Sequence, residues 1–169
     1  MTDWSALIQQ HGSLVWKTVF RLVSHDADAA DCFQNTFVAA LEFSRQERVH
    51  HWPGLLKHLA TMKALERLRQ RYRTARLEGD SNGTDGAEFT GSSPEHDIAA
   101  SELTSQLRLA LAELEPRQAQ VFCLCCLEES SYQEVAIETG LTVNHVGVLL
   151  NRAKASLRER LKAFAPAES

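Results

Sequence analysis

The sequence predicts an all-α protein of two small helical domains joined by a flexible acidic linker. Apolar residues recur at helical spacing along most of the 169 residues. A stretch rich in Gly, Ser and Asp interrupts this pattern at residues 77–97. Residues 131–161 read as a short helix, a glycine turn and a second helix. We therefore expect domains at 1–76 and 98–164, the second a four-helix domain with a helix-turn-helix.

The first two helices are expected at residues 3–23 and 27–44. The first has an apolar stripe that runs from Trp4 to Leu22. In the second, the residues expected to face inward are Ala30, Phe33, Phe37, Ala40 and Leu41. Its polar face carries acids near the helix N-terminus, where negative charge is favourable in any helix. From this helix alone, a solvated face explains the acids better than a docking surface for a basic partner.

The third helix is expected to open at Pro53, because proline is well suited to the first helical position. Beyond its apolar stripe it is strongly basic, with aromatic residues such as Trp52 and Tyr72 interleaved. Bases mixed with aromatics suit phosphate neutralisation and base stacking on separated DNA strands. A solvated basic helix is the alternative, but the excess of charge favours nucleic acid. The bases are Lys57, Lys63, Arg67, Arg69, Arg71, Arg73 and Arg76.

The net charge of −4 hides a strong segregation of charge along the chain. Residues 45–76 hold nine Lys or Arg and two Glu, whereas residues 77–100 hold six acids and no Lys or Arg. The acidic stretch is dominated by small polar residues, which bury too little apolar surface to offset the entropy of ordering. The chain therefore alternates a basic block, an acidic linker and a mildly basic C-terminal unit.

The C-terminal domain is expected to contain helices at residues 98–114 and 116–128, followed by the helix-turn-helix. Ser131 with Glu134 forms a capping-box signature. Gly140 suits the left-handed end of that helix, and Thr142 suits the cap of the next one. The apolar segment of the first helix is Val135, Ala136 and Ile137, and the buried face of the second is Val143, Val146, Leu149, Leu150, Ala153 and Leu157. This pattern is typical of DNA-binding proteins, although an ordinary helical hairpin would share it.

Several function classes are disfavoured by the sequence. It has no glycine-rich phosphate loop, nucleophile elbow or paired metal-ligand motif, so we expect neither an enzyme nor a cofactor, metal or small-molecule substrate. Three of the four cysteines crowd into residues 123–126, which favours reduced, packed thiols over a disulfide framework. No apolar run approaches the ~20 residues of a membrane span, and no signal peptide is visible, so we expect a cytoplasmic protein without membrane insertion.

The order of these parts resembles the extracytoplasmic-function (ECF) subgroup of bacterial sigma-70 RNA polymerase sigma factors. The resemblance runs from about Leu7 to Leu161. The stretches that carry it are DADAADCFQNTFVAAL (26–41), LLKHLATMKALERLRQRYR (55–73), LRLALAELEPRQAQVFCLCCLEESSYQEVA (107–136) and GLTVNHVGVLLNRAKASLRERL (140–161). It implies a factor that binds core RNA polymerase and promoter DNA and directs promoter recognition and opening. It also makes an anti-sigma partner plausible.

The resemblance assigns roles to positions that match the family pattern. Asp28, Asp31 and Gln34 match the helix that docks on the polymerase, with Phe37 expected in the core. The segment that opens the −10 promoter element is matched by Lys63, Arg67, Arg69, Arg71 and Arg73. The helix that enters the −35 major groove is matched by Asn144, His145, Gly147, Val148, Asn151 and Arg152.

The chain departs from the family pattern at several of these places. Where the family usually has tryptophan, asparagine and aspartate, this chain has Leu55, Met62 and Glu66. In the recognition helix the usual threonine, serine and arginine are His145, Val148 and Leu149. Two alternatives therefore stay open: a helix-turn-helix regulator that acts without polymerase, and a polymerase-binding relay protein whose promoter contacts have decayed.

Overall fold

A computed structural model describes residues 1–78 and 94–164, with side chains from residue 101 onward in the second range. Within these ranges every regular element is a helix, which confirms the predicted all-α class. The elements are α1 (Trp4–Val23), α2 (Asp26–Gln46), α3 (Trp52–Glu78), α4 (Pro94–Glu113), α5 (Pro116–Phe122), the π-helix η1 (Cys123–Leu127), α6 (Tyr132–Thr139), α7 (Val143–Leu161) and the 3₁₀ turn η2 (Lys162–Phe164). No described helix has the length and hydropathy that crossing a membrane requires.

The boundaries of the first two helices are set by capping side chains and by the backbone conformation of nearby residues. The Asp3 carboxylate accepts a hydrogen bond from the Ala6 amide and caps α1. Ser24 then adopts φ 55°, which ends α1 and turns the chain into α2. Two acids, Asp26 and Asp28, stand in the first turn of α2, where the helix dipole favours them. These short-range signals explain why the predicted boundaries lie close to the observed ones.

The predicted linker at 77–97 is helical at both edges. Helix α3 continues to Glu78, and α4 already begins at Pro94, where proline suits the first helical turn. Residues 79–93, which make up most of the predicted linker, lie outside the described part of the chain.

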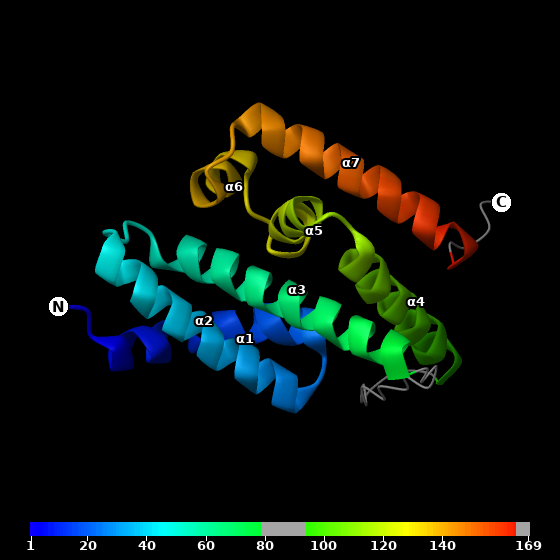
Figure 1. Cartoon of the computed structure of the whole chain (residues 1–169), viewed down its shortest axis with the longest axis horizontal. Coiled ribbons are helices and arrows are strands. Elements are labelled where there is room, and N and C mark those ends of the chain that lie inside the picture. Colours follow the sequence, from blue (N-terminus) through cyan, green and yellow to red (C-terminus); the bar gives the residue numbers. More distant parts are fainter. Residues whose placement is uncertain (79–93, 165–169) are drawn as a thin grey trace.

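The two predicted domains pack against each other and share a hydrophobic core. Its N-terminal part is contributed by α1, α2 and α3, for example through Val19, Leu56 and Leu65. The same cluster continues into the C-terminal half through Leu111 and Cys123. Figure 1 shows α3 along the junction, with α1 and α2 on one side and α5 on the other. The halves are therefore in contact over most of the length of α3.

A second, smaller core lies inside the helix-turn-helix. Val121 and Leu124 from the α5–η1 segment pack there with Val135 of α6 and with Val146 and Leu150 of α7. Helix α7 packs on α4, α5 and α6, and α5 separates it from α3 (Figure 1). This core packs α6 against α7, while Ala153 and Leu157 of α7 belong to the core that is shared with the N-terminal half.

Several side chains expected inside are exposed. Ala30 is exposed on α2, Ile137 is 79% exposed on α6, and Val143 is 46% exposed at the start of α7. Each lies at the edge of its apolar stripe, and short helices such as α6 cover only a narrow strip of core. Phe37, in contrast, is buried as predicted.

The helix expected at residues 116–128 changes its winding before it ends. Residues 116–122 are α-helical, but the cysteine-rich segment Cys123–Leu127 forms a π-helix. The Glu128 amide donates to the Cys123 carbonyl, which is the wider spacing of a π-turn. Helical periodicity alone predicts a helix here without distinguishing the two windings.

Candidate functional site

The turn between α6 and α7 has the geometry that the sequence predicted. The Ser131 hydroxyl accepts from the Glu134 amide at 3.1 Å, and the Glu134 carboxylate accepts from the Ser131 amide at 2.8 Å. Gly140 ends α6 in the left-handed region with φ 73°. The Thr142 hydroxyl then accepts from the His145 amide at 3.1 Å and starts α7. The predicted capping box, glycine stop and threonine cap are all confirmed.

Most of the residues predicted to read the −35 element point to solvent. Asn144, His145, Asn151 and Arg152 are all exposed on α7, and Val148 is 37% exposed between them. They form one face of the helix, opposite the buried residues of the second core. Amide and guanidinium groups on an exposed helix can make the paired hydrogen bonds that distinguish bases in a major groove.

Gly147, also predicted to read the −35 element, is half-buried on the same helix. A Cβ on Gly147 would lie 3.4 Å from the ring of Tyr132 on α6, which is an ordinary van der Waals contact. A small side chain would therefore fit at this position, and the packing of α6 against α7 does not by itself require glycine.

The predicted docking acids and the predicted −10 bases are joined by ion pairs between α2 and α3. The Asp28 carboxylate accepts from Arg67 Nε at 3.0 Å and from Arg67 Nη2 at 2.6 Å. Arg71 Nη1 lies 4.0 Å from the same carboxylate. This hydrogen bond with Asp28 raises the pKa of the Arg67 guanidinium above its ordinary value. Asp28 thus fixes α3 against α2, and its side chain is only 16% exposed.

Asp31 and Gln34 remain accessible on the outer face of α2. The Asp31 side chain is 62% exposed, and its carboxylate lies 3.8 Å from Arg67 Nη2. Gln34 is also exposed, one turn further along the helix. Of the three residues predicted to bind polymerase, these two are therefore available to a partner, whereas Asp28 is largely occupied.

Another side of α3 is covered by the C-terminal half of the chain. His58 Nδ1 lies 2.9 Å from the side-chain Nε2 atom of Gln120 on α5. The Tyr72 hydroxyl donates to the Ser105 carbonyl of α4 at 3.4 Å, and Arg76 pairs with Glu113 of α4. The residues predicted to bind the −10 element thus differ in exposure. Arg73 is exposed and Lys63 is half-buried, whereas Arg69 Nε and Nη2 are inaccessible to solvent at the junction of the two halves.

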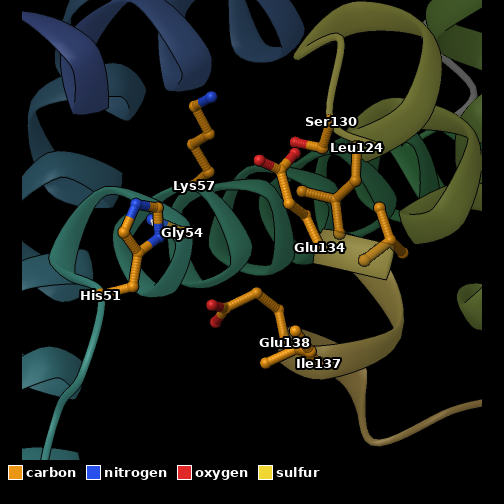
Figure 2. Close-up of a pocket in the computed structure, with 9 residues that line it drawn as sticks. His51, Gly54, Lys57, Leu124, Ser130, Glu134, Ile137 and Glu138 are labelled. Atoms are coloured by element: carbon orange, nitrogen blue, oxygen red, sulfur yellow. Dashed lines mark hydrogen bonds between the residues drawn. The ribbon is translucent and has the colours of Figure 1, made fainter. Parts of the chain in front are cut away.

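The N-terminal end of α3 meets α6 at a pocket of about 280 Å³ (Figure 2). The Glu138 side chain extends from α6 toward His51 and Gly54. A Cβ added to Gly54 would lie 2.5 Å from the Glu138 carboxylate, so the absence of a side chain there permits this contact. Burial raises the pKa of Glu138 above its ordinary value, although the nearby His51 opposes the shift.

Helix α1 is also tied to the C-terminal half. The Arg21 guanidinium donates to the Leu127 carbonyl and lies 3.4 Å from the Glu128 carboxylate, whose side chain is only 8% exposed. Arg108 of α4 donates to the Arg21 carbonyl at 3.1 Å. These contacts neutralise a largely buried acid and occupy a carbonyl in the last turn of α1.

Cys32, Cys123 and Cys125 lie in environments that keep their thiols protonated. Burial raises the pKa of both Cys32 and Cys125 to about 11, and it raises the pKa of Cys123 further. A protonated thiol is a weak nucleophile and a poor metal ligand. Among the described residues no three His, Cys, Asp or Glu side chains gather closely enough to hold a metal ion.

Sequence reasoning missed the residues that join the halves. Arg21 pairs with the Leu127 carbonyl 106 positions away, and His58 with Gln120 62 positions away. Glu138 likewise approaches His51 and Gly54 from a distant helix. No local pattern distinguishes such residues from other polar positions on a helix surface. The only signal available was the presence of polar residues, such as His58, beside an apolar stripe.

Comparisons with known proteins agree with this architecture. Residues 104–157 match the family model of sigma-70 region 4. The ECF RNA polymerase sigma factor SigE of Mycolicibacterium smegmatis is 28% identical over 161 residues. That alignment covers 95% of this chain but 62% of the relative, so the chain spans less than two thirds of that protein's length. The RNA polymerase sigma factor YlaC of Bacillus subtilis is 24% identical, with 92% of this chain and 90% of the relative aligned.

A solved structure shares the fold. The sigma factor RpoE of Bartonella quintana, crystallised with the anti-sigma factor NepR, superposes with a TM-score of 0.54 at 20% identity. The match covers 96% of this chain and 98% of that one. The region 4 match and the two relatives together show that this chain is similar to the sigma-70 family of RNA polymerase sigma factors, and to its ECF group in particular.

Proposed function

We propose that this protein binds core RNA polymerase and directs promoter recognition, promoter opening and the initiation of transcription. The observation that carries the proposal is the region 4 match at residues 104–157, in which α7 presents Asn144, Asn151 and Arg152 to solvent. A sigma factor acts by binding, so the proposal requires no catalytic residue and no cofactor. The two relatives reported above are RNA polymerase sigma factors.

Each half of the chain would bind a different part of the polymerase–promoter complex. Residues 1–76 would dock on polymerase through the exposed Asp31 and Gln34, with Asp28 holding α3 in place beside them. The basic helix α3 would hold the −10 DNA strand through Lys63, Arg67, Arg69, Arg71 and Arg73. Residues 98–164 would place α7 in the −35 major groove through Asn144, His145, Gly147, Val148, Asn151 and Arg152. Residues 77–97 would connect the halves.

This division requires the halves to separate on the promoter. The −10 and −35 elements are about 25 base pairs apart by definition, which is roughly 85 Å along B-form DNA. A folded chain of this length is only roughly 40 Å across when compact. Because α3 and α5 are in contact in the free protein, we infer that polymerase binding opens the contacts of Arg21, His58 and Tyr72.

The proposed function also implies a cellular compartment and a further protein partner. A factor that works on core polymerase and promoter DNA acts in the cytoplasm. The Bartonella quintana relative was solved with an anti-sigma factor, and we extend the proposal to an inhibitory protein partner of that kind.

The test is to bind the full-length protein to purified bacterial core polymerase and then to transcribe a genomic fragment library with the complex. The expected result is a stable complex and new transcription start sites that depend on the protein. A complex without initiation would instead favour a relay protein with decayed promoter contacts. Binding to duplex DNA without any affinity for polymerase would favour a regulator that acts alone.

A further inference from the structure

A second pocket lies between the C-terminal end of α3 and the helices α4 and α7. Its volume is about 520 Å³, within the range typical of small-molecule sites. The side chains that define it are Arg69, Tyr72, Arg73, Arg76, Glu113 and Arg160, here called the arginine pocket. Because α3 belongs to the N-terminal half and α4 and α7 to the C-terminal half, the pocket exists only while the halves are together.

Positive charge in the arginine pocket exceeds negative charge. Four guanidinium groups surround a single carboxylate, that of Glu113. Arg76 and Arg160 both pair with Glu113, so this one carboxylate is shared by two cations. Arg73 is exposed and makes no ion pair within the described residues. The local balance leaves a positive excess, which attracts an anion to the pocket.

Arg69 adds a second, independent indication. Its Nε and Nη2 atoms have essentially no solvent exposure and no hydrogen-bond partner among the described residues. A guanidinium that loses water without gaining an acceptor is destabilising. A bound anion in the adjoining pocket would offset this charge at close range.

We propose that the arginine pocket binds an oligophosphate, a small anion with several linked phosphate groups. Guanidinium groups bind phosphate oxygens through paired hydrogen bonds, and several phosphates are needed to engage arginines from both α3 and α7. Such a ligand contacts both halves of the chain and therefore stabilises their packed arrangement. This inference does not depend on polymerase binding and holds or fails separately from the proposed function.

The direct test is titration calorimetry of the full-length protein with sodium tripolyphosphate at constant ionic strength. We expect saturable binding of one tripolyphosphate per chain. Arg73→Ala removes an arginine that makes no ion pair within the described residues, and it should weaken binding about tenfold through loss of a charge-assisted contact. Arg158→Ala is the matched control, since Arg158 is exposed on α7 and does not line the pocket. Equal weakening by both variants, or no saturable binding, would overturn the proposal.

A second variant should strengthen the binding of tripolyphosphate rather than weaken it. Glu113→Gln frees Arg76 and Arg160 and removes the negative charge from the pocket, so tripolyphosphate should bind several-fold more tightly. A purely structural role of Glu113 would weaken or abolish binding instead, which would count against the proposal. Circular dichroism before each titration verifies that the variant is folded.

The phosphate groups of a DNA strand have the same chemistry, so a DNA strand is the alternative ligand for this pocket. A short single-stranded oligonucleotide is titrated against the same variants. If it binds through Arg73 more tightly than tripolyphosphate does and displaces it, the pocket is a DNA-strand site and the oligophosphate proposal fails. The intact chain retains its acidic residues 77–97, so any competition from them is already included in the measured affinity.

Discussion

At the scale of single residues, the structure separates side chains that look alike in the sequence. Asp28 and Asp31 are both acids on α2, yet Asp28 is bound by Arg67 at 2.6 Å whereas Asp31 is 62% exposed. Arg69 and Arg73 are both bases on α3, yet only Arg69 has nitrogens without exposure. We therefore expect Asp31 and Gln34 to contact a partner, and Asp28 to contribute to folding.

Replacement of Asp31 and Gln34 together by alanine should weaken binding to core polymerase by about tenfold or more, because two exposed polar contacts are lost. The unfolding free energy should change little, since both side chains are exposed. A pull-down at several protein concentrations, with chemical unfolding in parallel, measures both quantities. Glu42→Ala, an exposed acid further along α2, is the control. Unchanged affinity of the double variant would remove the docking assignment.

His58 should make the protein sensitive to acid. Burial lowers the pKa of His58 below its ordinary value of 6.5, so the unfolded chain takes up the proton at a higher pH than the folded one. Stability from this residue is therefore complete above pH 6.5 and is lost as the pH falls below it. Thermal unfolding from pH 7.5 to pH 5 should thus show a steeper loss in the natural protein than in His58→Gln. Parallel pH profiles would contradict this expectation.

At the scale of elements, the helix-turn-helix depends on backbone conformation as well as on its small core. Gly140 holds φ 73°, and a Cβ added there would meet nothing within 4 Å. A substitution at this position therefore tests backbone strain without steric clash. The neighbouring caps from Ser131 and Thr142 fix the two helix starts, so the turn is determined by residues within a few positions of one another.

Gly140→Ala should destabilise the protein by about 1 kcal/mol, because alanine is strained in the left-handed region. Gly140→Asn should cost less, since asparagine tolerates that conformation better. Urea unfolding of the two variants measures the difference, and the order of the two costs is the diagnostic result. If both variants were equally destabilised, the strain explanation would be wrong.

At the scale of the whole molecule, the two halves are joined by a shared core and by polar contacts around it. Leu65 of α3 and Leu111 of α4 belong to one hydrophobic cluster. Arg21 on α1 and His58 on α3 reach across to the α5–η1 segment. The exposed face of α7 stays free of these contacts, whereas part of α3 is covered by them. The residues predicted to read the −35 element are therefore more exposed in the free protein than those predicted to hold the −10 element.

Arg21→Ala should weaken the junction, because it leaves the nearly buried Glu128 carboxylate without its cation. We expect a loss of about 1 to 2 kcal/mol, less than for a fully buried pair, since the Arg21 side chain is 35% exposed. Adding Glu128→Gln to this variant should restore part of the loss. A double-mutant cycle from chemical unfolding gives the coupling between the two residues. No coupling would mean that the contact contributes nothing to joining the halves.

The sequence by itself determined the features that depend on near neighbours. Helix periodicity, the Ser131 capping box, the Gly140 stop and the Thr142 cap all act over four residues or fewer, so they could be read directly. The order of the helices also sufficed for the family resemblance. The exposed face of α7 followed from the same periodicity, because its buried and exposed residues alternate at helical spacing.

Only the tertiary structure decided which of the charged residues remain available. Asp28 and Arg67 are 39 positions apart, and Arg21 and Glu128 are 107 positions apart. Pairings over such distances depend on how whole helices pack, which is determined by the summed burial of many apolar side chains. The same packing brings Arg69 and Arg160 to one pocket and covers part of the basic helix, although every one of these residues would be exposed on an isolated helix.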